Sequence, residues 1–460
     1  MKTLRHIFLI SFLLSASLLL SAQTAAPMTE GQLSEKFADG LREFYSADYQ
    51  HAETSFRYVL SKNPKHDASY FMLAKIRSQQ KEYAGASYYL QEAIKLDKSN
   101  IWYKVMLAET YDLMNDYASS TKLWKEICKL KPENEQYLIS LSQAYLNNEQ
   151  YKEVVKTYDQ IEVLIGYNEE ITEAKKNIWL YYNDIKRAAG EYDKLIKEFP
   201  YEPKHYVNAG NIYLTNGMPE KALTYYKKAA EIAPNDPYTN VAMANYYQQK
   251  GDDEGYYTVL LRAFQSQELA ADEKLNYLKA YLTTAMKNRT NVQAQNRCVK
   301  LASTFVEVHP DMVEGWATMG ILKLNMGKYE EAKEAFERSL SMDNTHFTIW
   351  EDYLFVLSQL KDYKTIISCE KDLSELFPSN ASMMYCLGRA FQKEGNPTKA
   401  LEYLKTASTY SYDSRQLAQI YNTMGDAYQA LGNQEEAVKY WRMAKQKGMN
   451  TQELKSKLGE

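Results

Sequence analysis

Residues 313–346 read VEGWATMGILKLNMGKYEEAKEAFERSLSMDNTH. Its apolar residues recur at spacings of three and four on both sides of Met326-Gly327, a pattern typical of two amphipathic helices joined by a turn. A small residue stands midway along the first helix, at Gly320, and early in the second, at Ala332. Two helices approach to about 8 Å only where the facing side chains are small, so this stretch predicts a tight helical hairpin.

The hairpin pattern recurs along the chain at a constant interval. Tyr49, Tyr83, Tyr117 and Tyr151 are evenly spaced, and the same spacing separates Tyr329 from Tyr363. A single hairpin cannot bury its apolar face alone, and successive units therefore have to stack. The regular interval predicts an all-α protein that consists of stacked hairpins.

These residues give the chain a resemblance to the tetratricopeptide repeat, whose pattern is an aromatic residue, Leu-Gly, two tyrosines, Ala, an aromatic residue, Ala and Pro. Residues 313–346 fit it with Trp316, Met319-Gly320, Tyr329 and Phe336. The resemblance implies a right-handed superhelical solenoid of about twelve repeats. It also implies that the first helix of each repeat lines a concave, protein-binding surface.

The repeat interval divides the chain into segments. Residues 33–270 hold seven repeats, 271–312 an irregular helical hairpin, 313–451 four further repeats, and 452–460 a capping helix with capping-box spacing between Asn450 and Glu453. The extra length of 271–312 leaves two interpretations open: a hinge near residue 270, or simply longer helices.

The N-terminal segment, residues 1–22, differs from the rest. A short basic stretch precedes an almost wholly apolar run from Ile7 to Ala22, followed by small residues, which is typical of a cleaved secretory signal peptide. The run is short for a membrane-spanning helix, and no second long apolar run follows. We expect export to a bacterial periplasm or cell envelope, and no transmembrane segment in the mature chain. The Ser-Ala-Gln ending resembles signal peptides common in Bacteroidetes.

Several function classes find no support in the sequence. It contains none of the nucleotide-binding, nucleophile-elbow or zinc-protease motifs, and its few histidines are scattered, so we expect no enzyme, no cofactor and no metal site. The net charge of −4 argues against a nucleic-acid partner. The four cysteines have no framework spacing, and only Cys369 and Cys386 are near enough in sequence to consider as a disulfide.

A polar ladder occupies one position of the first helix in successive repeats. Its members, separated by the repeat interval, are Glu109, Gln143, Asn177, Asn211 and Asn245. Amide side chains both donate and accept hydrogen bonds, so the ladder could bind the backbone of an extended peptide, with Lys204 and Asn208 nearby. The alternative is that these residues only make the concave face polar.

An aromatic patch is the second candidate surface. Phe37, Phe44, Phe71 and Trp102 fall on groove positions of the first three repeats. Exposed aromatic residues favour binding hot spots, although this face could instead pack on the leading segment or on another copy of the chain.

The leading hypothesis is therefore a non-catalytic scaffold of the periplasm or cell envelope that binds a protein or peptide in its concave groove. The alternatives are an envelope glycan-binding or polymer-binding module, for which the aromatic patch is the natural site, and a self-assembling structural protein. The sequence leaves the partner and the oligomeric state open.

Overall fold

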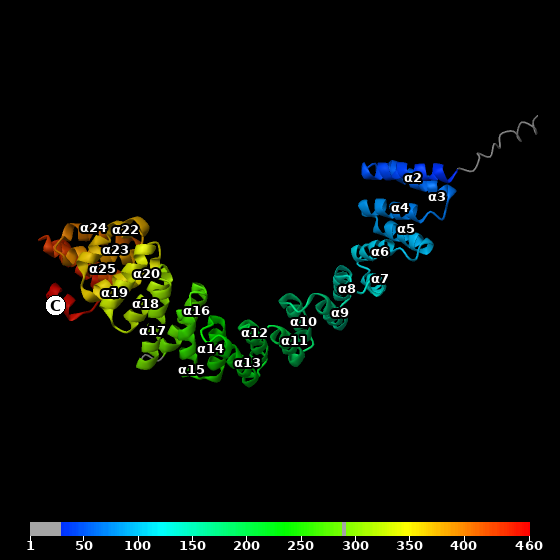
Figure 1. Ribbon diagram of the computed structural model, residues 1–460. Coiled ribbons are helices and arrows are strands. Elements are labelled where there is room, and N and C mark those ends of the chain that lie inside the picture. Colours follow the sequence, from blue (N-terminus) through cyan, green and yellow to red (C-terminus); the bar gives the residue numbers. More distant parts are fainter. Residues whose placement is uncertain (1–28, 288–290) are drawn as a thin grey trace, which may run out of the picture. The chain divides into compact units, whose positions relative to one another are not determined.

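Helices are the regular elements of the computed structural model, which describes residues 29–287 and 291–460 (Figure 1). The expected signal peptide, residues 1–22, lies outside the described residues. The helices form consecutive antiparallel pairs, except that the second helix of the tenth pair is interrupted at Cys369, and one short helix follows the last pair. Their bounds are α2 Glu30–Tyr45, α3 Tyr49–Lys62, α4 Asp67–Gln79, α5 Tyr83–Leu96, α6 Ile101–Leu113, α7 Tyr117–Leu130, α8 Glu135–Asn147, α9 Tyr151–Ile165, α10 Glu169–Tyr181, α11 Ile185–Glu198, α12 Pro203–Thr215, α13 Pro219–Ile232, α14 Pro237–Lys250, α15 Asp253–Gln265, α16 Ala271–Lys287, α17 Val292–Val308, α18 Val313–Asn325, α19 Tyr329–Met342, α20 Phe347–Leu360, α21 Tyr363–Ser368, α22 Glu370–Leu376, α23 Ala381–Lys393, α24 Pro397–Tyr410, α25 Ser414–Ala430, α26 Gln434–Gln446 and α27 Gln452–Leu458.

The chain divides into two compact units. The first ends at Pro200 and contains α2–α11, and the second begins at Tyr201 and contains α12–α27. The irregular pair α16–α17 shares one apolar core with α15 and α18, and the boundary between the units lies near residue 200 rather than near residue 270, where a hinge was one of the two interpretations. The extra length of this pair lies in the helices, which have 17 residues each.

The predicted close approach of the two helices is present in several hairpins. An added methyl group on Gly210 of α12 would lie 2.4 Å from the Tyr226 ring of α13, and one on Gly320 of α18 would lie 2.6 Å from the Phe336 ring of α19. Both distances are shorter than real carbon–carbon contacts. Glycine is therefore required where a bulky ring of the second helix lies against the backbone of the first.

Among the described residues, the turns inside the hairpins place one residue in the left-handed region. Glycine fills this position in several repeats, such as Gly217 at φ 74° and Gly327 at φ 71°. The earlier repeats put ordinary residues there, including Ala47 at φ 62° and Glu149 at φ 56°. This conformation is unfavourable for residues with a Cβ atom, so these turns carry local strain.

The last helix covers the end of the stack. Leu454 of α27 is buried in one cluster with Trp441 of α26, as an open stack requires. The expected capping box at Asn450 is wrong by one residue. Thr451 is the N-cap, and its hydroxyl accepts a hydrogen bond from the Leu454 N–H at 3.2 Å.

Candidate functional site

Asn177 stands on α10, whose start is fixed by local chemistry. The side chain of Asn168 caps the helix by accepting a hydrogen bond from the Ile171 N–H at 2.9 Å. Glu169 and Glu170 follow in the first turn, where the positive end of the helix dipole favours acidic residues. These features set where α10 begins and hence which of its residues face outward.

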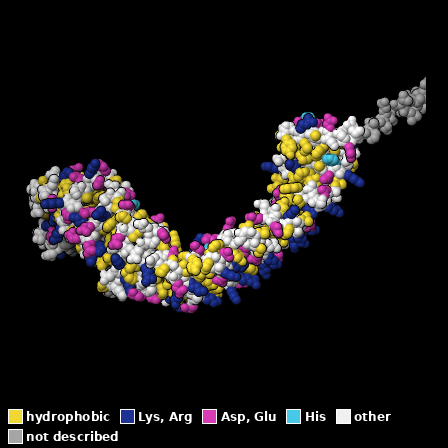
Figure 2. Space-filling view, viewed as in Figure 1, with side chains coloured by type: hydrophobic (Ala, Val, Ile, Leu, Met, Phe, Trp, Pro, Cys, Tyr) yellow, Lys and Arg dark blue, Asp and Glu magenta, His cyan; other side chains and the backbone are white. Residues whose placement is uncertain are grey.

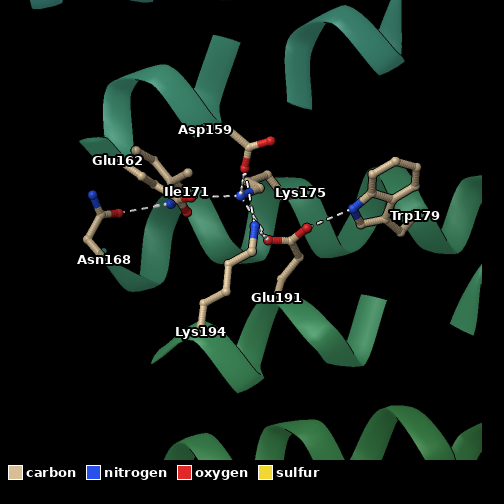
Figure 3. Close-up of polar contacts among 8 residues, drawn as sticks. All are labelled: Asp159, Glu162, Asn168, Ile171, Lys175, Trp179, Glu191 and Lys194. Atoms are coloured by element: carbon tan, nitrogen blue, oxygen red, sulfur yellow. Dashed lines mark hydrogen bonds and ion pairs between the residues drawn. The ribbon is translucent and has the colours of Figure 1, made fainter. Parts of the chain in front are cut away.

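A buried lysine then holds α10 against its neighbours. Lys175 occupies the place of Leu107 and Leu141 in the two preceding repeats, and its side chain is fully buried. Its ammonium group lies 2.5 Å from Asp159 and 2.8 Å from Glu162, both on α9 (Figure 3). A carboxylate of α11, Glu191, is also 2.8 Å away.

The cluster extends to two further side chains. Trp179 donates its indole N–H to Glu191 Oε1 at 2.9 Å, and Lys194 lies 2.7 Å from the other Glu191 oxygen (Figure 3). Residues of α9, α10 and α11 therefore meet in one network of charge-assisted hydrogen bonds, where most repeats use apolar contacts. The sequence analysis did not single out this network. The feature of the sequence that indicates it is Lys175, which stands where the two preceding repeats have leucine.

The charges in this cluster keep each other ionised. Burial alone would lower the pKa of Lys175, but the hydrogen bonds that it donates to Asp159, Glu162 and Glu191 outweigh it and raise that pKa above its ordinary value. Burial likewise opposes ionisation of Asp159, yet Lys175 and Lys194 bring the pKa of its carboxyl below the usual value. The network is thus ionic at neutral pH and fixes α10 between its neighbours.

An apolar pocket opens beside Asn177. It has a volume of about 310 Å³ and lies where α8, α9 and α10 meet. Leu146, Tyr158 and Tyr181 line it together with Asn177 itself. The Tyr181 side chain is exposed and packs edge-on against Tyr151, with ring centroids 5.1 Å apart.

The Asn177 amide is exposed and makes no hydrogen bond within the described part of the chain. It therefore keeps both a donor and an acceptor for a ligand at the edge of an apolar pocket. This combination suits a peptide, which offers backbone hydrogen bonds and side chains together.

The other ladder residues of the first unit differ from Asn177. Gln143 is exposed but donates its amide to Asn147 at 2.8 Å, which leaves chiefly its carbonyl for a ligand. Glu109 is also exposed, and desolvation together with the nearby Asp112 raises the pKa of its carboxyl. Two apolar residues of the same helix, Ile139 and Leu146 of α8, are partly exposed as well.

The remaining ladder residues belong to the second unit. Asn211 and Asn245 are exposed, but each carbonyl already accepts a tyrosine hydroxyl, from Tyr226 at 2.7 Å and from Tyr277 at 3.2 Å. Lys204 is exposed and Asn208 half-buried on the same helix, α12. The valines four residues before Asn211 and Asn245 are buried, so this half of the ladder lacks exposed apolar edges.

Only part of the aromatic patch is exposed to solvent. Figure 2 shows hydrophobic side chains gathered over the first repeats. The expectation for Phe44 is wrong: it is buried, because it packs against Tyr49 across the turn. Phe37 and Phe71 are half-buried and belong to the apolar packing of these repeats. Trp102 alone of the four is strongly exposed, at 66%.

Among the described residues, no group of His, Cys, Asp and Glu side chains has the arrangement needed to hold a metal ion. The four cysteines are free thiols, including Cys369 and Cys386. In the same part of the chain, no helix combines the length and apolar character that a membrane crossing requires.

Comparison with known proteins fits this geometry. Tetratricopeptide repeat family models match residues 37–101, 203–236, 313–346 and 379–444. The chain is a tetratricopeptide repeat protein. Such repeats form protein-interaction scaffolds and are generally non-catalytic.

Individual relatives are distant. A TPR repeat-containing protein of Methanocaldococcus jannaschii is 28% identical over 113 residues, which are 25% of this chain and 19% of the relative. The anaphase-promoting complex subunit cut9 of Schizosaccharomyces pombe is 24% identical over 127 residues, 27% of this chain and 19% of that protein. The chain thus spans less than a fifth of these curated relatives.

Solved structures are matched at low similarity. A complex described as Naa15/Naa10 bound to HypK-THB matches at a TM-score of 0.40 and 16% identity, covering 93% of this chain and 78% of the matched one. Yeast Tom70 matches at a TM-score of 0.29 and 12% identity, covering 86% and 95%.

Proposed function

We propose that this tetratricopeptide repeat protein is a non-catalytic scaffold that binds an extended peptide segment of a partner protein at Asn177. The observation that carries the proposal is the exposed Asn177 amide beside the pocket lined by Leu146, Tyr158 and Tyr181. The amide would pair with the peptide backbone, and the pocket would take one apolar side chain. The buried Lys175 cluster would hold both in place, so that little conformational entropy is lost on binding.

A pull-down from envelope extract tests this proposal. We compare the chain lacking residues 1–22 with two variants, Asn177→Ala and Leu146→Ser, each altered at one exposed residue of the site. Asn148→Ala is the matched control, because Asn148 lies in the same repeat as Leu146 and does not line the pocket. Specific proteins captured by the parent and the control, but lost from both site variants, would support the proposal. Equal capture by all four proteins would refute it.

We also propose that the protein acts after export, in the periplasm or cell envelope. The proposal rests on the basic segment and apolar run of residues 1–22, a signal-peptide pattern. N-terminal sequencing of the protein from fractionated cells tests it. A chain that starts near residue 23 in the envelope or periplasmic fraction would support export, and a full-length chain in the cytoplasmic fraction would contradict it.

A further inference from the structure

A second groove lies on the first unit, away from Asn177. It has a volume of about 520 Å³ and runs between α7 and α9, the second helices of two neighbouring repeats. Leu138, Leu141 and Tyr145 of α8 line it and are buried. The groove shares no lining residue with the pocket beside Asn177, so it is a separate surface.

One wall of this groove is aliphatic and open to solvent. Val163 and Leu164, in the last turns of α9, line the groove and are 85% and 40% exposed. The helix continues to Ile165, which is also largely exposed, and stops at Gly166. Consecutive exposed aliphatic residues that border an apolar groove are typical of an interaction site.

The rim of the groove is basic. Lys125 and Lys129 of α7 are exposed and form no ion pair with any described residue. Lys156 of α9 also lines the groove and is paired with Glu153 at 2.6 Å. Lys and Arg side chains are concentrated along the edge that carries α7 and α9 (Figure 2), although the protein as a whole is acidic.

We propose that this groove binds an acidic segment of a partner protein, which inserts a leucine or phenylalanine side chain between α7 and α9. The buried residues of α8 would receive the apolar side chain, and Val163 and Leu164 would cover it. Lys125 and Lys129 would pair with Asp or Glu residues on either side of it. The two free lysines select acidic over basic flanks, since electrostatic complementarity decides which partner a surface accepts.

Three labelled probe peptides test the proposal by fluorescence anisotropy. All carry the same central Leu-Phe pair, flanked by three Glu, three Gln or three Lys residues on each side. We expect the Glu-flanked peptide to bind about tenfold more tightly than the Gln-flanked one at low salt, and the Lys-flanked peptide to bind most weakly. Equal affinity for the three peptides, or no binding of any of them, would overturn the proposal.

Two double variants separate the groove from net charge. Lys125→Glu with Lys129→Glu should abolish the preference for Glu flanks and favour Lys flanks. The control, Lys98→Glu with Lys122→Glu, makes the same change in net charge at exposed lysines that do not line the groove, and should behave like the parent. The same loss in both double variants would mean that only overall charge matters, and the groove would be rejected.

Two further measurements locate the binding. Hydrogen exchange should show slower exchange in the last turns of α7 and α9 when the Glu-flanked peptide is added, and Asn177→Ala should bind it as tightly as the parent. Loss of binding in Asn177→Ala would place the peptide at the other site. A last measurement is co-sedimentation with phosphatidylglycerol vesicles. If the parent co-sediments, the groove double variant does not, and no peptide binds, the groove is a lipid site and the proposal is refuted.

Discussion

Lys175 Nζ and Glu162 Oε2 lie 2.8 Å apart, and both side chains are almost entirely removed from solvent. The lysine stands where Leu107 and Leu141 fill the core of the two preceding repeats. A buried charge is tolerated only with close partners, and here carboxylates from both neighbouring helices supply them. The position of α10, and therefore of Asn177, depends on ion pairs.

Lys175→Met should be strongly destabilising. The substitution keeps the length of the side chain but leaves the buried Glu162 carboxylate without its cation and Glu191 with Lys194 alone, at a cost of about 3–5 kcal/mol. Urea denaturation at pH 7 measures the loss. Lys176→Met is the control, since Lys176 pairs only with the more exposed Glu173, and it should cost less than about 1 kcal/mol.

The same variant has a pH signature. In the folded protein the pKa of Asp159 is lowered, chiefly by Lys175. The Asp159 carboxylate therefore contributes its full stabilisation above the pKa that it has in the unfolded chain, and this stabilisation is lost as pH falls through its pKa in the folded protein. The difference in stability between the parent and Lys175→Met should therefore be largest near neutral pH and shrink below about pH 4. A difference that stays constant from pH 7 to pH 3 would contradict an ionic cluster.

Lys274 should make stability depend on pH in the alkaline range. It is buried in α16, forms no ion pair with a carboxylate among the described residues, and donates to His309 Nε2 at 2.8 Å. Burial lowers its pKa to about 8. Between that value and the unfolded pKa of about 10.4 the unfolded chain binds more protons, so stability should rise with pH across this window.

Denaturation of the parent and of Lys274→Met from pH 7 to pH 10 tests this. Other groups titrate in the same range, so the quantity of interest is the difference between the two proteins. It should change in favour of the parent by at most about 1.4 kcal/mol per pH unit, the limit for one proton. Parallel pH profiles would show that Lys274 is not the titrating group.

The fold was predictable from sequence because the constant repeat interval fixes which positions face each other. The small residues Gly320 and Ala332 and the ring of Phe336 fall where this alignment requires. Burial of individual aromatic residues was harder to predict. Phe44 and Trp102 both occupy groove positions, yet Phe44 lies in the last turn of α2 and packs across the turn, whereas Trp102 lies in the first turn of α6 and stays exposed.

The binding surfaces were less predictable for a related reason. The repeat interval places Asn177, Asn211 and Asn245 at equivalent positions, but it does not show that tyrosine hydroxyls already occupy the carbonyls of two of them. It also marks Lys175 as an irregularity without naming its partners, which lie on two other helices. Those contacts depend on side-chain positions that only the packed stack defines.

Ala47→Gly should stabilise the first hairpin. Ala47 adopts φ 62°, in the left-handed region, where a Cβ atom costs about 1–2 kcal/mol and glycine avoids that cost. Because glycine gives the unfolded chain more freedom, the net gain should be below about 1 kcal/mol. Thermal denaturation measures it, and Gly217→Ala, which reverses the exchange at an equivalent turn, should lower stability.

Gly320→Ala should destabilise the hairpin of α18 and α19. The new methyl group would lie 2.6 Å from the Phe336 ring, which is fully buried and cannot move away freely. Overpacking of this kind costs about 1–3 kcal/mol. In the background of Phe336→Leu the same substitution should cost clearly less, because the ring is gone, and a double-mutant cycle measures the difference. Additive losses would mean that this contact does not limit the approach of the helices.

Trp102→Ala separates binding from folding. The side chain is 66% exposed, and its loss should change stability by no more than about 0.5 kcal/mol. If the surface around it contacts a partner protein, the substitution should weaken that binding by at least tenfold, as is usual for an exposed tryptophan in a hot spot. Tyr88→Ala, at another strongly exposed aromatic residue of the first unit, is the control and should leave binding unchanged. Titration of each variant with the partner captured by the pull-down gives the comparison, and equal affinities would remove Trp102 from the binding surface.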